Sequence, residues 1–325
     1  MGALPVIDLA PAFAGSRDDR LRLAKAVGTA CEEIGFLVVS NHRLPWSLVE
    51  EAFAVSREFF ALPTERKLQY AAPDPTTPRG YNAFISKNLG RTYGLDTPPD
   101  LREQYFIGPL AANPGDWHSY PGAERFYSTN IWPECLPAYR TVFSALYREM
   151  EGLARELMRL FALALVLDED YFDDKIDRHF STLPSNHYPA LPAEVVPEQR
   201  RAGAHTDFGS LTILAIAGNA GGLQVDLPGR GWTEVRPPAE CFVVNLGDMM
   251  ARWTDDRWRS TLHRVANPPA SASGDARQSL GYFLHPNYDA EVACLPSCLR
   301  PGKAPTYPPI MAGLHMREKL ERRAA

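Results

Sequence analysis

Residues 205–216 read His-Thr-Asp-Phe-Gly-Ser-Leu-Thr-Ile-Leu-Ala-Ile, a histidine and an aspartate followed by an apolar run. Side chains two apart on a β-strand point to the same face, so His205 and Asp207 can bind one metal ion. The pair alone is a weak signal, because about half such a pair is expected by chance in a chain of this composition. A metal site therefore needs a third ligand from another part of the chain.

His263 supplies that ligand, 56 positions after Asp207 and inside the strand-like run 260–265. Two imidazoles and one carboxylate form the facial triad of non-haem Fe(II) oxygenases, which leaves adjacent coordination positions for a co-substrate and dioxygen. The same three ligands also hold Zn(II) in hydrolases, so these residues alone leave the metal open.

The segment that begins at Arg277, 14 residues after His263, favours the oxygenase. Arg277 and Ser279 precede the apolar run 280–284, and strand alternation places both on one side together with Phe283. A buried arginine is costly unless an anion meets it, and a guanidinium beside a hydroxyl suits a carboxylate. An ion pair with a protein carboxylate, or simple exposure, is the alternative explanation.

The rest of the chain predicts helices first and a β-rich core afterwards. Helical spacing of apolar residues predicts helices over 20–34, 47–60 and 139–167, and 36–40 predicts an early strand. Residues 71–130 are irregular, which leaves two interpretations, a functional lid or short strands that the pattern does not resolve. The later strand-like runs are 180–182, 186–188, 211–216, 222–225, 241–246, 262–266 and 279–284. Short strands separated by turn signals predict an antiparallel sandwich or barrel.

Composition excludes several classes of protein. Of 325 residues, 45% are hydrophobic and 22% charged, which is typical of a globular chain rather than a disordered one. The net charge of -5 and the lack of a basic stripe argue against nucleic-acid and membrane-surface partners. No apolar run reaches the ~18 residues of a membrane span, and no signal-peptide pattern is present. Five scattered cysteines without a Cys-x-x-Cys pair predict reduced thiols and a cytoplasmic location.

Taken together, these motifs resemble the isopenicillin N synthase-like branch of the Fe(II)/2-oxoglutarate-dependent oxygenases. The resemblance covers nearly the whole chain, and 205–212 is its most specific block. The matching segments are 5–8, 33–42, 59–63, 79–81, 130–133, 186–189, 205–214, 222–224, 245–248, 263–265, 284–287 and 307–310. One departure is visible: Arg43 stands where the family commonly has glycine.

The resemblance implies a mainly β fold with flanking helices around a double-stranded β-helix, a distorted jelly roll. It also implies one catalytic domain over residues 1–325. Its expected parts are an N-terminal strand, helix and lid region (1–130), a bracing helix (131–177), a jelly-roll core with the metal site (178–290), and a tail with a final helix (291–325).

The resemblance also implies the cofactors and the reaction. His205, Asp207 and His263 would bind Fe(II), and 2-oxoglutarate would chelate it through its C1 carboxylate and C2 keto oxygen. The residues implied to bind the rest of 2-oxoglutarate are Arg277, Ser279, Tyr188 and Asn186. With dioxygen, this would yield succinate and CO2 and a hydroxylated, desaturated or ring-closed small molecule.

Other residues receive weaker assignments. The segment around Glu103 often lines the substrate entrance in this family, and the candidate substrate residues are Phe208, Tyr105, Phe106 and Phe283. His187 and His285 lie in family motifs without being ligands there. The histidines expected to be structural or surface groups are His42, His118, His179 and His315. Asp248 is expected to form a turn rather than bind metal.

Three other functions compete with a 2-oxoglutarate-dependent oxygenase. The first is a 2-oxoglutarate-independent oxidase of the isopenicillin N synthase type, in which Arg277 would bind another carboxylate. A non-catalytic binding protein of the same fold is the second, although it would have no need for all five motif residues. A zinc hydrolase is the third, and it gives no reason for the Arg-x-Ser pair. The substrate could be an amino acid, nucleobase, small acid or secondary metabolite, and the sequence does not indicate the oligomeric state.

Overall fold

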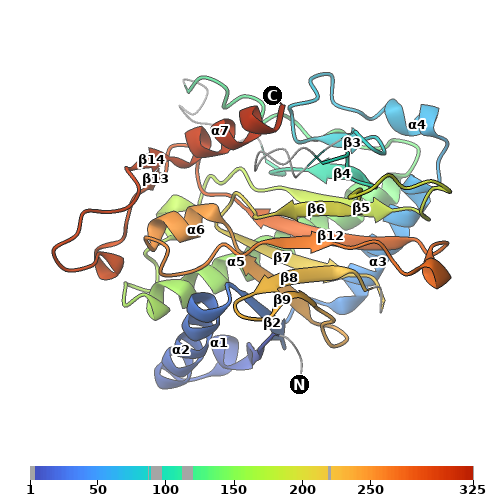
Figure 1. Cartoon of the computed structure of the whole chain (residues 1–325). Helices are drawn as coiled ribbons and strands as arrows, with labels where there is room; N and C mark the ends of the chain where they lie inside the picture. Colours follow the sequence, from blue (N-terminus) through green and yellow to red (C-terminus); the bar gives the residue numbers. More distant parts are fainter. Residues whose placement is uncertain (1–3, 87, 89–96, 112–119, 219–220, 325) are drawn as a thin grey trace.

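Two β-sheets of unequal size form the centre of the computed structural model, which describes residues 4–86, 88, 97–111, 120–218 and 221–324 (Figure 1). The larger sheet, in spatial order, consists of β1 (Val6–Asp8), β2 (Phe36–Ser40), β10 (Phe242–Leu246), β7 (Leu211–Ile216), β12 (Arg277–Leu284), β5 (Leu183–Tyr188), β4 (Glu103–Ile107) and β3 (Gly80–Asn82). The smaller consists of β6 (Ala202–His205), β11 (His263–Val265), β8 (Leu223–Leu227) and β9 (Gly231–Glu234). Apart from these, β13 (Glu291–Val292) pairs with β14 (Ile310–Met311).

Strand alternation gives the large sheet two different faces. On β7, Ile213 and Ala215 belong to the main core beneath the helices, whereas Ile216 packs with Val225 of the smaller sheet. The two sheets therefore enclose their own apolar layer, as in a double-stranded β-helix. Polar side chains on the inner face, Thr212 among them, border the space that these sheets enclose.

Helices cover the outer face of the large sheet. Helices α2 (Arg17–Glu33) and α3 (Trp46–Phe60) both pack on α5 (Pro137–Ala164), whose buried stripe includes Leu146, Leu153 and Leu160. The shorter helices are α1 (Ala10–Ala14), α4 (Thr64–Leu68) and α6 (Asp248–Trp253), and α7 (Ala312–Ala324) follows β14. Figure 1 shows α7 on the side of β3 and β4, away from α1 and α2. Within the described ranges, no helix is both long and apolar enough to cross a bilayer.

Local chemistry explains where the predicted elements begin and end. Helix α2 starts earlier than predicted because Ser16 and Asp19 form a capping box. It stops as predicted, at Gly35, which has a φ of 75°. Arg43, the departure from the family, also has a positive φ of 64°, which explains why glycine is common there. Its guanidinium lies 4.7 Å from the Phe13 ring centroid, a contact that glycine cannot make.

The interval 71–130 contains short strands, one of the two interpretations of its sequence: β3 and β4 have three and five residues, too few for a clear pattern. Two other points of the predicted secondary structure need correction. Residues 180–182 form no strand, and only an isolated bridge joins Thr182 to Phe283. Strand β9 was not predicted, since its side chains are largely exposed and carry no apolar alternation.

Candidate active site

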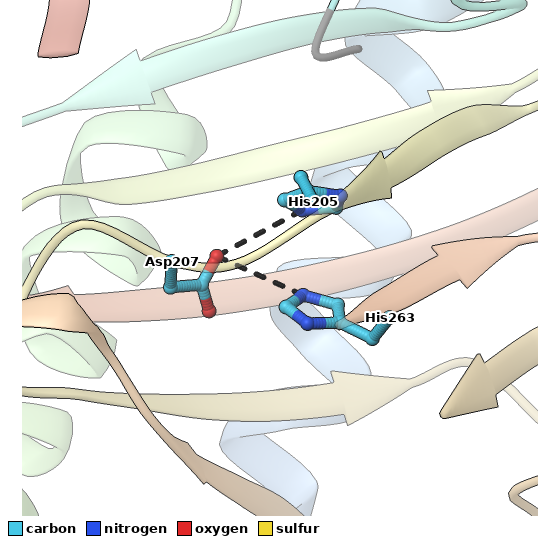
Figure 2. Close-up of side chains that lie close together, drawn as sticks. All are labelled: His205, Asp207 and His263. Atoms are coloured by element: carbon cyan, nitrogen blue, oxygen red, sulfur yellow. Dashed lines mark ion pairs between the residues drawn. The ribbon is translucent and has the colours of Figure 1, made fainter. Parts of the chain in front are cut away.

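His205 and His263 lie on two neighbouring strands of the smaller sheet, and Asp207 joins them from the turn after the first of these strands (Figure 2). His205 ends β6 and pairs directly with His263, which begins β11. Asp207 Oδ1 lies 3.8 Å from His205 Nε2 and 3.7 Å from His263 Nε2. Among the residues that the structure describes, this is the one group of at least three ligating side chains with its atoms close enough to share a metal ion.

Asp207 reaches this group in a different way from the one predicted. The strand ends at His205, so simple alternation along β6 does not place Asp207. Instead, the backbone carbonyl of Asp207 accepts a hydrogen bond of 2.7 Å from the Asp248 amide at the start of α6. The turn after β6, anchored by α6, therefore directs the carboxylate toward the two imidazoles.

Backbone carbonyls set the tautomer of both imidazoles. His205 Nδ1 lies 2.8 Å from the carbonyl of Gly203, and His263 Nδ1 lies 3.1 Å from the carbonyl of Thr261. Because a carbonyl only accepts hydrogen bonds, each Nδ1 carries the proton and donates it. Each Nε2 then keeps its lone pair and faces Asp207, which is the arrangement that metal-binding histidines adopt.

The other carboxylate oxygen of Asp207 is held by two side chains that the sequence analysis did not single out. Oδ2 accepts hydrogen bonds from Thr212 Oγ1 at 2.6 Å and from Asn245 Nδ2 at 2.7 Å. Oδ1 is left to face the imidazoles as a single ligand. Both donors lie in the quoted motifs 205–214 and 245–248. Alternation along β7 directs Thr212 to the inner face of the sheet, which could have indicated its contact with Asp207.

Replacing Thr212 by valine should weaken Fe(II) binding by about 10- to 100-fold, the range for hydrogen-bond partners of metal ligands. Valine keeps the shape of threonine but removes the donor to Asp207. Anaerobic titration of the metal-free protein with Fe(II) measures the effect. Thr233→Val, on exposed β9, is the matched control; equal affinities for the two variants would contradict the assigned role of Thr212.

The three ligands fit Fe(II). Two neutral nitrogen donors and one carboxylate oxygen lie on one side of a common point, and all their ligand atoms lie within 4.8 Å of one another. Such a 2-His-1-carboxylate set leaves coordination positions open for other molecules. The cluster is nearly buried, with 12% of the His205 side chain and 6% of the Asp207 side chain exposed.

A second cluster lies on β12 and β5, where Arg277 stands opposite Tyr188 and Ser279 opposite Asn186. The Arg277 guanidinium donates to the carbonyl of Gly221 at 3.0 Å and to Ser279 Oγ at 3.4 Å. Its carbon lies 4.9 Å from the Tyr188 ring centroid. Asn186 accepts a hydrogen bond of 2.7 Å from another side-chain amide, that of Gln104.

Arg277 is a buried cation without an anionic partner within the described ranges. Only 2% of the residue is exposed, and its Nη2 has no hydrogen-bond partner among the described residues. Burial lowers the pKa of this guanidinium, which shows how strongly the surroundings disfavour its charge. A carboxylate bound at Nη2 would balance that charge, so the alternative of an ion pair within the protein is not what the structure shows.

A cavity of about 500 Å³ opens beside His205 and Asp207. Its wall includes His205 and Asp207, and three of the four candidate substrate residues, namely Phe106, Phe208 and Phe283. None of the four residues of the second cluster is part of this wall. The two regions adjoin, because Gln104 lines the cavity and donates a hydrogen bond to Asn186. The cavity is large enough for a drug-sized molecule.

Tyr105, the fourth candidate substrate residue, points away from the cavity. Its side chain is fully buried in the core, its ring centroid lies 4.6 Å from that of Phe59, and its hydroxyl donates to the carbonyl of Ile131 at 2.7 Å. Phe106 is the next residue of β4, and adjacent residues on a strand face opposite sides. The sequence analysis named both, and only Phe106 lines the cavity.

Glu103 lies two residues before Tyr105 on β4 and therefore faces the same way, away from the cavity. It belongs to a buried polar cluster and not to the substrate entrance. Its carboxylate accepts hydrogen bonds from Lys67 Nζ at 2.7 Å, the Tyr81 hydroxyl at 2.5 Å and His187 Nδ1 at 2.8 Å. Burial raises the pKa of Glu103, but these three donors outweigh it and hold the pKa below its usual value. The cluster joins α4 to β3, β4 and β5.

Replacing Lys67 by methionine should reduce the free energy of unfolding by about 3 kcal/mol, because it leaves the Glu103 carboxylate buried without its charged partner. Chemical denaturation monitored by circular dichroism measures the change. Lys25→Met, on the exposed face of α2, is the control and should have little effect. A loss below about 1 kcal/mol for Lys67→Met would show that Tyr81 and His187 suffice.

The remaining histidines lie outside the metal cluster, as predicted for those that the structure describes. His179 pairs with Glu151 at 2.6 Å, and His42 Nε2 bonds the carbonyl of Glu240 at 3.1 Å. His285 lines the cavity, and burial lowers its pKa to about 3, which keeps it neutral. The other two are His315, which is buried and does not belong to the cluster, and His118, which lies outside the described residues.

Asp248 has more contacts than the predicted turn-forming role requires. It begins α6, accepts hydrogen bonds of 2.7 Å from the hydroxyls of both Thr206 and Ser260, and pairs with Lys319 of α7 at 2.6 Å. It does not belong to the metal cluster. Asp248 instead connects the turn that carries Asp207 to the last helix of the described chain.

A double-stranded β-helix with a 2-His-1-carboxylate cluster and a buried arginine defines the class of Fe(II)- and 2-oxoglutarate-dependent oxygenases. Two family models match the chain. Residues 4–135 match the non-haem dioxygenase in morphine synthesis N-terminal model, and residues 180–286 match the 2OG-Fe(II) oxygenase superfamily. The chain belongs to this superfamily, in its isopenicillin N synthase-like branch, and is an oxygenase of this class.

Curated relatives and solved structures are similar to this protein over nearly the whole length of its chain. The 2-oxoglutarate-Fe(II) type oxidoreductase hxnY of Emericella nidulans is 34% identical over 314 residues, covering 95% of this chain and 86% of the relative. Validamycin A dioxygenase of Streptomyces hygroscopicus subsp. limoneus is 31% identical, covering 90% and 80%. A full-length Neurospora crassa protein solved with alpha-KG and thymine superposes with a TM-score of 0.84 at 30% identity, covering 98% of this chain and 96% of that chain.

Proposed function

We propose that His205, Asp207 and His263 bind the Fe(II) of this oxygenase and that Arg277 binds the distal carboxylate of 2-oxoglutarate. The residues that complete the 2-oxoglutarate site are Ser279, Tyr188 and Asn186. The observation that carries this assignment is the buried Nη2 of Arg277, which has no partner among the described residues. Bound iron supplies the activation of dioxygen, by which 2-oxoglutarate becomes succinate and CO2 while a small molecule is oxidised.

Each residue has a definite task in this assignment. The two imidazoles present Nε2 lone pairs because their Nδ1 protons are held by backbone carbonyls. Arg277 neutralises the distal carboxylate and fixes its direction, with Ser279 as a second donor. Tyr188 shields the guanidinium with its ring. Asn186 lies two residues before Tyr188 on β5, opposite Ser279, and would bond near the keto end of the co-substrate.

The cavity that includes Phe106, Phe208 and Phe283 is the prime-substrate site in this proposal. Its wall includes two of the proposed metal ligands and Gln104, which bonds Asn186, so the prime substrate would lie next to the co-substrate. Relatives named proline hydroxylase and validamycin A dioxygenase support a small organic substrate, and secondary metabolism as its setting. The net charge of -5 supports the absence of nucleic-acid and membrane partners.

Residues 1–325 form one catalytic domain in this proposal. The cavity wall supports this, because Asn82, His205 and Met316 come from three of the four expected parts, 1–130, 178–290 and 291–325. The fourth part, 131–177, contributes the long helix α5 beneath the large sheet. All five cysteines are unpaired, which supports a reducing compartment such as the cytoplasm.

An anaerobic titration of the Fe(II)-loaded protein with 2-oxoglutarate tests the assignment. A bidentate 2-oxo acid on Fe(II) gives a weak visible charge-transfer band, and we expect a saturable band with one equivalent of co-substrate. Admission of oxygen should then release succinate. Bound Fe(II) without a band would favour the oxidase alternative, in which Arg277 binds a substrate carboxylate instead.

A further inference from the structure

Arg125 is a cation in the wall of the prime-substrate cavity that neither the metal site nor the co-substrate site uses. Its Nε and Nη2 atoms are buried and have no hydrogen-bond partner among the residues that the structure describes. The guanidinium carbon lies 4.9 Å from the ring centroid of Phe126, which also lines the cavity. Buried donors are nearly always paired in folded proteins, so these two atoms call for a ligand.

Among the described residues of the wall, the other charged side chains have an ion-pair partner or an assigned role. Arg102 pairs with Asp100 at 3.2 Å, and Glu321 pairs with Arg317 at 3.4 Å. Asp207 is a proposed metal ligand, and both histidines of the wall are accounted for, His205 by the metal and His285 by its neutral state. Arg125 therefore supplies one uncompensated positive charge, which matches a ligand with one negative charge.

Aromatic rings form much of the remaining wall next to Arg125. Phe126 lies 5.1 Å from Phe180, and Phe180 stacks on His285 at 5.1 Å with an interplanar angle of 16°. Phe208 and Phe283 also face this space. Flat side chains of this kind favour offset stacking or edge contacts with a planar ring, and they offer few polar partners to a hydrophilic chain.

We propose that the prime substrate is a planar aromatic or heteroaromatic small molecule with a carboxylate, and that Arg125 binds that carboxylate. This inference rests on the proposed function, because it names the substrate class of the same cavity. A guanidinium binds a carboxylate through two parallel hydrogen bonds, for which Nε and Nη2 are geometrically suited. A phosphate ester, with its second charge, would need a second uncompensated cation.

Binding of matched acids and amides tests the proposal without turnover. The enzyme is loaded with Fe(II) and saturating 2-oxoglutarate under nitrogen. One- and two-ring carboxylates, among them benzoate, 4-hydroxybenzoate, indole-3-carboxylate and 2-naphthoate, are then compared with their carboxamides by calorimetry. We expect the tightest acid to bind at least about tenfold more tightly than its amide. No acid binding, or equal binding of acids and amides, would overturn the proposal.

Substitutions of Arg125 test whether this residue causes the preference for the acid over the amide. Arg125→Gln should lower the affinity for the acid at least about tenfold and leave that for the amide unchanged, whereas Arg125→Lys should keep part of the preference. Arg230→Gln, in the exposed turn between β8 and β9, is the matched control. An undiminished preference for the acid in Arg125→Gln would also overturn the proposal.

The 2-oxoglutarate band separates this inference from the proposed function. If the band is intact in wild type and in Arg125→Gln while the acid preference is missing, the substrate class is wrong and the site assignment stands. If wild type shows no band, the site assignment fails, and the inference fails with it.

Discussion

Replacing His205 by alanine should leave an enzyme that folds but neither retains Fe(II) nor forms succinate. His205 contributes one of the two imidazole nitrogens that lie within 3.8 Å of Asp207 Oδ1 among the described residues. Loss of a direct ligand should exceed the roughly 100-fold upper range for losing a hydrogen-bond partner of a ligand. We therefore expect succinate formation from 2-oxoglutarate to fall more than about 100-fold at micromolar Fe(II).

His187→Ala is the matched control for this prediction. His187 lies on β5 and bonds Glu103, on the face of the sheet away from the metal cluster. Its removal should leave the iron content of the purified protein unchanged, because Lys67 and Tyr81 still bond Glu103. Iron content and succinate release are measured on both variants. Full activity in His205→Ala would refute the metal assignment.

On regular strands, the alternation of side chains between the two faces of the sheet allowed neighbouring site residues to be predicted from sequence. The pattern of β12 placed Arg277, Ser279 and Phe283 on one side, and the register of β12 with β5 then brings Tyr188 opposite Arg277. β7 has the predicted bounds, 211–216. Both strands are buried on nearly every position, so a short apolar run bounded by turn signals, rather than alternation, indicated each of them.

Side-chain alternation did not predict the direction of residues beyond the end of a strand. It also did not show which face of a strand borders the cavity. Asp207 lies beyond the end of β6, so its direction depends on a contact with α6 that is distant in sequence. For β4, alternation shows that Tyr105 and Phe106 face opposite ways, but not which of them faces the cavity. That choice depends on pairing with β5, which the sequence pattern does not reveal.

The substrate cavity was the least predictable part, because its wall is assembled from distant segments. Arg125 lies in an irregular stretch without any motif, and Met316 belongs to the last helix. Neither residue has a spacing relation to the 205–212 block. Only the folded chain places them together, which is why the metal site could be predicted at the level of single residues and the substrate class could not.

Replacing Arg277 by methionine should weaken 2-oxoglutarate binding by about 3 kcal/mol, or roughly 100-fold, the cost of losing one member of a buried charge pair. Methionine occupies similar space, and it also removes a buried charge from the co-substrate-free protein, so the fold should be at least as stable. Anaerobic titration of the Fe(II)-loaded variant, monitored by the charge-transfer band, measures the affinity. Arg264→Met, on β11 of the smaller sheet, where Arg264 bonds Gln224, is the control and should bind as wild type does.

A second 2-oxo acid distinguishes loss of a specific contact from general damage to the site. 2-Oxopentanoate has the same chelating end as 2-oxoglutarate and no distal carboxylate. Wild type should prefer 2-oxoglutarate by about 100-fold, and Arg277→Met should bind both acids alike, because the contact that discriminates between them is absent. If the variant keeps the preference, the distal carboxylate binds elsewhere. If both acids are weakened equally, Arg277 supports the structure of the site rather than the charge of its ligand.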